Sequence, residues 1–79
     1  MNVAEKVREI VANYIGIPLN EVENSSYLQD DLNSDPLTMA DLVVSLEDEF
    51  KLEIPPEESM KFEKVEDIIN YIGDKIGEV

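Results

Sequence analysis

The chain has 79 residues with six Lys and Arg against 19 Asp and Glu, no His and no Cys, and a formal net charge of -13. This charge disfavours binding to nucleic acid or to an anionic membrane, because both need a basic face. Without His and Cys the chain lacks the most frequent general bases, thiol nucleophiles and zinc ligands. The apolar runs are too short to cross a bilayer, and the N-terminal residues lack a signal-peptide pattern. We therefore expect one domain over residues 1–79 that is cytoplasmic, monomeric, not an enzyme and without a metal site.

Hydrophobic periodicity in the first part of the chain predicts a helix followed by a long loop. Apolar residues recur at helical spacing over residues 3–15, and Gly16 followed by Pro18 is a typical helix end. Residues 16–35 contain the Pro, Asn and Ser residues that are typical of a loop. A loop of this length needs attachment to the core. The expected apolar anchors are Ile17, Val22, Tyr27, Leu28 and Leu32.

The second half of the chain predicts two further long helices and one short one. Residues 36–50 form a helix in this prediction, because Asp35 can cap its free amides and Pro36 fits its first position. The two prolines at positions 55 and 56 end that region, and a short helix is expected over residues 57–61. The last helix is predicted from the helical spacing of Val65, Ile68, Ile69, Ile72 and Ile76. No strand pattern competes, so the expected fold is an all-α bundle of three main helices and one short helix.

The predicted second helix carries apolar residues on two faces. Its core stripe comprises Met39, Leu42, Val43, Leu46 and Phe50. Leu37 and Val44 lie outside that stripe, beside the acids Asp41 and Asp48. Either the core face is simply wide and the acids are solvated, or the pair is a docking stripe for a basic partner. The helical wheel alone leaves both interpretations open.

Residues 31–37 (DLNSDPL) and 41–50 (DLVVSLEDEF) resemble the signature of the acyl carrier proteins. The similarity extends over nearly the whole chain, through residues 7–16, 20–22, 53–55, 57–58 and 65–72. The resemblance implies a small acidic four-helix bundle with a long first loop. It also implies a 4'-phosphopantetheine arm on a serine at the start of the second helix. Such carriers shuttle thioester-bound acyl chains among the enzymes of fatty-acid and polyketide synthesis.

The resemblance also assigns two sets of residues by position. The second helix would dock on basic-surfaced partner enzymes through Asp35, Leu37, Asp41, Val44, Glu47 and Asp48. An acyl pocket between the second and third helices would be lined by Val43, Leu46, Ile54, Ser59, Met60, Phe62, Ile69 and Ile72. The apolar residues of this second set are also expected to be ordinary core residues, because a core position needs the same hydrophobic character as a pocket wall.

The chain departs from the family pattern at the attachment position. The family sequence Asp-Ser-Leu is replaced by Asp35-Pro36-Leu37, and proline has no hydroxyl that could accept the arm. The helix itself should be unaffected, because proline is well tolerated in a first turn. No cofactor is therefore expected on this sequence. Ser34, two residues upstream, is the second candidate for attachment, although a transferase that reads the usual geometry would reject it.

Three functions remain open from the sequence. The first is an acyl-carrier-like docking protein without an arm. The second is a working acyl carrier whose arm is on Ser34, or which has lost its serine only in this variant. The third is an acidic cation-binding protein that uses Asp30, Asp31 and Asp35, or Glu47, Asp48 and Glu49. These clusters lack the alternating ligands and central glycine of an EF-hand loop, which argues against the third function.

Overall fold

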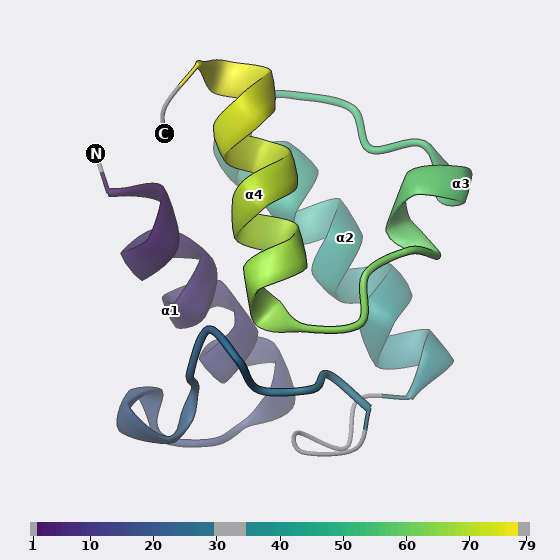
Figure 1. Cartoon of the computed structure of the whole chain (residues 1–79). Helices are drawn as coiled ribbons and strands as arrows, with labels where there is room; N and C mark the ends of the chain where they lie inside the picture. The colour runs from purple at the N-terminus through teal and green to yellow at the C-terminus, as the bar shows by residue number, and fades with distance from the viewer. Residues whose placement is uncertain (1, 30–34, 78–79) are drawn as a thin grey trace.

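The computed structural model describes residues 2–29 and 35–77, which fold into helices around one apolar core (Figure 1). Its elements are α1 (Val3–Ile15), the 3-10 turn η1 (Leu19–Glu21), α2 (Pro36–Phe50), α3 (Pro56–Ser59) and α4 (Val65–Ile76). The described residues contain no strand, only an isolated antiparallel bridge between Tyr27 and Lys64. None of the described helices has the length and apolar character needed to span a bilayer. The predicted all-α architecture, with three main helices and a short one, is confirmed.

The helix boundaries follow from capping residues that are visible in the sequence. The Asn2 side chain accepts a hydrogen bond from the Glu5 backbone amide at 3.0 Å, which completes the start of α1. Gly16 ends α1 in the left-handed conformation, with φ of 82°. At the start of α2 the Asp35 side chain accepts from the Thr38 amide at 2.7 Å, and Pro36 is the first helical residue. Both predicted helix boundaries, residues 3–15 and 36–50, are therefore correct.

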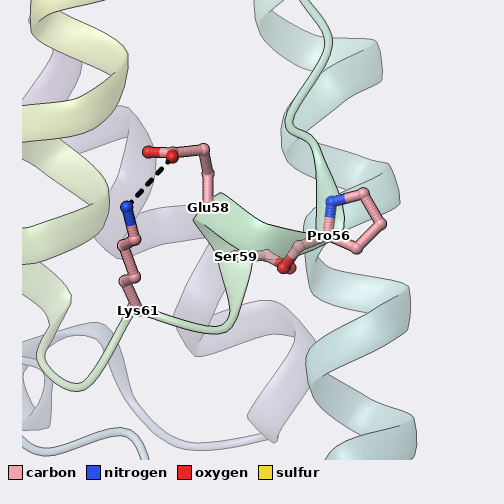
Figure 2. A network of polar contacts seen from close by, with 4 residues as sticks. All are labelled: Pro56, Glu58, Ser59 and Lys61. Atoms are coloured by element: carbon pink, nitrogen blue, oxygen red, sulfur yellow. Dashed lines mark hydrogen bonds and ion pairs between the residues drawn. The ribbon is translucent and has the colours of Figure 1, made fainter.

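The prediction for the short helix was wrong at both ends. α3 covers Pro56–Ser59 and not residues 57–61, because Pro56 itself occupies its first helical position. The Met60 amide donates to the Pro56 carbonyl at 3.0 Å, which completes this single turn. The Ser59 hydroxyl also donates to the Pro56 carbonyl at 3.0 Å, and Lys61 pairs with Glu58 at 3.2 Å (Figure 2).

The core forms where α1 packs against both α2 and α4. Burial of these apolar side chains supplies the main driving force for folding. The largest side chains that are fully removed from solvent come from α1, the first loop, α2 and α4: Val7, Val11, Leu28, Leu42, Leu46, Val65, Ile68 and Ile72.

The first loop is attached to the core by three of its predicted anchors. Val22 and Leu28 are buried, and Ile17 is half-buried. Tyr27 was also expected as an anchor, and its side chain is 40% exposed. Tyr27 lies beside α4 through its backbone bridge, with the Lys64 Nζ atom 5.0 Å from the centre of its ring. Leu32 lies outside the described residues.

Residues 24–28, which we call the loop strap, join the first loop to the start of α4. The Ser26 carbonyl accepts from the Val65 amide at 3.1 Å, and the Asn24 carbonyl accepts from the Glu66 amide at 2.9 Å. The Leu28 amide donates to the Glu63 carbonyl at 2.8 Å. The strap thus satisfies amides at a helix start that would otherwise lack a partner.

Candidate functional site

The start of α2 is the position at which the resemblance places the attachment serine. Pro36 occupies it and is exposed, so this accessible first turn presents a ring without a hydroxyl. Hydrogen bonds from the Thr38 backbone amide and then from the Thr38 hydroxyl hold the pKa of the Asp35 carboxyl below its ordinary value. Ser34, the second candidate for attachment, lies outside the described residues.

Five of the six predicted docking residues are exposed to solvent. Leu37 and Val44 are 74% and 56% exposed, as expected for apolar residues outside the core stripe. Three exposed acids on this helix and at its cap belong to the predicted set: Asp35, Asp41 and Asp48. We call these five residues the outer face of α2. An apolar pair bordered by carboxylates suits a partner surface that combines a hydrophobic hollow with basic residues.

The sixth predicted docking residue, Glu47, has a structural contact that the sequence did not indicate. Glu47 is half-buried, and its Oε2 atom accepts a hydrogen bond from the Ile54 backbone amide at 2.8 Å. This contact ties the last turns of α2 to the segment that leads into α3. The neighbouring Glu49 turns elsewhere, with its Oε2 atom 3.5 Å from the Nζ atom of Lys6 in α1.

The acidic clusters do not converge on a cation site where the structure can describe them. Glu47 contacts a backbone amide, Glu49 contacts Lys6, and Asp48 is exposed between them. Across residues 2–29 and 35–77 no three potential metal-ligating side chains come together. Asp30 and Asp31, which belong to the other cluster considered, fall outside that description.

A hollow of about 660 Å³ lies between α2 and the segment that contains α3. Five of the eight residues predicted for the acyl pocket line it: Val43, Ile54, Ser59, Met60 and Phe62. The sequence missed the remaining lining residues, which are Gln29, Pro36, Met39, Ala40, Glu47 and Pro56. The spacing of Pro36, Met39, Ala40 and Val43 along one helical face could have identified four wall positions.

Three residues predicted for the acyl pocket are absent from the lining of this hollow. Leu46 and Ile72 are fully buried in the core. Ile69 is half-buried and lines a separate hollow that also includes Val3 and Ala4 of α1. The helical period identified these residues as inward-facing but did not say which inner surface each one meets.

Comparison with known proteins places the whole chain in one family. A family profile described as "Phosphopantetheine attachment site" matches residues 5–72. An acyl carrier protein of Solidesulfovibrio magneticus is 40% identical over 78 residues, which cover 99% of this chain and 100% of that protein. An acyl carrier protein of Clostridium acetobutylicum is 43% identical over 70 residues, which cover 89% and 91% of the two chains. The chain therefore belongs to the acyl carrier protein family, whose members are carriers and not enzymes.

Proposed function

We propose that this protein is an acyl-carrier-like docking protein of fatty-acid, lipid or polyketide-type synthesis that carries no 4'-phosphopantetheine at the usual position. The observation that carries the proposal is Pro36, which occupies the first position of α2. Attachment of the arm needs an oxygen nucleophile that can be presented to a transferase. Pro36 lacks one, while the cap and the helix that would present it are intact.

The proposed docking surface is the outer face of α2. Its two apolar residues would enter a hollow on the partner, and its carboxylates would steer a basic surface toward them. The net charge of -13 favours a basic partner and disfavours self-association, so we propose a cytoplasmic monomer that binds enzymes of fatty-acid or polyketide synthesis. Glu47 would contribute to this surface mainly by holding the end of α2 in place.

A second candidate is a working acyl carrier, with its arm on Ser34 or with the serine lost only in this variant. It is favoured by the small difference between this chain and a carrier site. Asp35 caps the helix and Leu37 follows on the surface, so one substitution at Pro36 accounts for the departure.

Intact-protein mass measurement separates the armless function from a carrier whose arm is on Ser34. The protein is incubated with coenzyme A and a broad-specificity phosphopantetheinyl transferase. The armless function predicts no added mass on the unsubstituted chain and a complete gain on Pro36→Ser, which also proves that the transferase accepts this fold. A gain on the unsubstituted chain that disappears in Ser34→Ala would establish the working carrier and refute the proposal.

Docking is tested with a purified fatty-acid-synthesis enzyme that binds acyl carrier proteins. Val44→Asp, or the pair Asp41→Lys and Asp48→Lys, should abolish its capture while the helical circular dichroism is retained. The matched control is Glu9→Lys with Asp74→Lys, which makes the same charge change at exposed positions of α1 and α4. If the control variant lost as much enzyme capture as the charge-reversed α2 variant, the effect would be one of net charge alone. Unchanged capture by the α2 variants would refute this docking surface.

A further inference from the structure

The start of α2 keeps an ordered and accessible helix end, although its first residue has no reacting group. The Asp35 side chain accepts from the Thr38 amide at 2.7 Å, and the Asp35 carbonyl accepts from the Met39 amide at 2.9 Å. These two bonds fix the first turn of the helix. Pro36 is exposed on this turn, and the start of α2 lies at the end of the molecule opposite the chain termini (Figure 1). An enzyme can therefore approach this position from solvent.

The group that is missing at Pro36 is the nucleophile of the attachment reaction. In phosphopantetheine transfer, a hydroxyl oxygen of the carrier attacks a phosphorus atom of coenzyme A. The hydroxyl proton passes to a base, and the nucleotide part of coenzyme A leaves. The side chain of Pro36 has no oxygen, so no bond forms or breaks at this position and coenzyme A stays intact.

The surface that borders this position is available for binding. Leu37 and Val44 are 74% and 56% exposed, and the exposed carboxylates of Asp41 and Asp48 lie on the same helix. These side chains complement a basic enzyme surface that has an apolar hollow. Contacts that are equally strong before and during a reaction contribute to binding and not to rate. Such contacts remain when the reacting group is absent, so this chain can bind without being modified.

One class of enzyme must recognise a carrier from these features alone. Enzymes that act on a thioester contact both the arm and the protein surface, and this chain offers them no arm at Pro36. A phosphopantetheinyl transferase meets its carrier before any arm is present, so its contacts come from the protein surface and the helix start. Both features are present in this chain. The armless chain therefore meets the recognition needs of a transferase more completely than those of a thioester-handling enzyme.

From the ordered helix start, the exposed outer face of α2 and the missing hydroxyl, we infer that this protein is a pseudosubstrate inhibitor of a phosphopantetheinyl transferase. It occupies the carrier site of that enzyme beside coenzyme A, no bond forms, and the complex dissociates unchanged. While it is bound, other carriers are kept from receiving their arm. The inference rests on the proposed armless function and names the transferase as a partner of the outer face of α2.

The test measures phosphopantetheine transfer to Pro36→Ser while the concentration of the unsubstituted chain is raised. The two chains differ only at the attachment position, and intact-protein mass reports the modification of both in one sample. We expect inhibition that is competitive with Pro36→Ser, with a Ki within about threefold of the KM of that variant. Excess coenzyme A should not relieve it, because the chain does not occupy the coenzyme A site. No inhibition at about ten times this KM would overturn the inference.

Variants of the unsubstituted chain locate the inhibitory surface. Val44→Asp, or the pair Asp41→Lys and Asp48→Lys, should raise the Ki at least about tenfold. The control Glu9→Lys with Asp74→Lys has the same net charge as that pair and should leave the Ki nearly unchanged. Helical circular dichroism shows that each variant is folded. An unchanged Ki in the folded α2 variants, or an equal increase in the control, would refute binding through the outer face of α2.

The same mass measurement separates this inference from the proposed function. If the unsubstituted chain neither gains mass nor inhibits transfer, the armless function stands and only the pseudosubstrate role is lost. If the unsubstituted chain gains the mass of an arm, it is a substrate of the transferase. The armless function is then lost, and the inference is lost with it.

Discussion

The hydrogen bond between Glu47 and Ile54 allows a structural role to be separated from a docking role. Glu47→Ala removes the carboxylate oxygen that lies 2.8 Å from the Ile54 amide. Glu47→Gln removes the charge but keeps an oxygen that can accept the same bond. Asp48→Ala, at the next position of α2, removes an exposed acid of the outer face and serves as the control.

The expected magnitude follows from the burial of the bond. A hydrogen bond to a charged group contributes about 1.5–3 kcal/mol, and the half-buried position of Glu47 lowers this to about 1 kcal/mol. In a domain of 79 residues, that loss corresponds to a decrease in Tm of about 4–8 °C. Glu47→Gln should lose no more than about half as much free energy of unfolding. Asp48→Ala should change it by less than about 0.5 kcal/mol.

Urea denaturation followed by circular dichroism measures these free energies. Amide hydrogen exchange at Ile54 then reports the bond itself, and we expect faster exchange in Glu47→Ala than in Glu47→Gln. Equal stabilities for Glu47→Ala and Asp48→Ala, or unchanged exchange at Ile54, would refute the role assigned to this contact.

Three further predictions follow from the helix ends and from the charge. The lowered pKa of Asp35 means that its stabilising effect is fully present above the pKa of the unfolded chain and is lost as pH falls through the folded-state pKa. Asp35→Asn should keep the cap and reduce the loss of stability at low pH. Asp35→Ala should lower Tm at neutral pH as well. If Asp35→Asn lost as much stability at low pH as the unsubstituted protein, this reasoning would be contradicted. Lys51→Gly should raise the free energy of unfolding by about 0.5–1 kcal/mol, because Lys51 adopts a left-handed φ of 55° at the end of α2, and a lower urea midpoint would count against it. Added NaCl or MgCl₂ should raise Tm by screening the charge of -13, so a Tm independent of salt would refute that electrostatic argument.

The main helices were predictable because local chemistry fixes their ends. A cap at Asp35, a proline at the first position and a left-handed Gly16 need no tertiary information. Periodicity was a poorer guide to burial near the helix ends. Tyr14 and Ile76 follow the apolar spacing of α1 and α4, yet they are 46% and 38% exposed. The spacing identifies a face of a helix but not how much of it another element covers.

The same distinction between local and tertiary features applies to the candidate site. The lost hydroxyl at Pro36 and the exposure of Leu37 and Val44 could be predicted, because each depends on one residue type or on one helix. The lining of the hollow depends on how α2 is oriented against the segment that contains α3, which follows α2 in the chain. The contact between Glu47 and Ile54 joins a side chain to a backbone amide, and no hydrophobic pattern records such a pair.

The loop strap also has a consequence for folding. The first amides of α4 donate to the carbonyls of Ser26 and Asn24, so residues from the other half of the chain complete this helix. Contacts between distant segments form only after the entropy cost of closing the intervening chain has been met. We therefore expect the loop strap and the beginning of α4 to form together during folding, and removing the front of the chain would leave α4 without its starting partners.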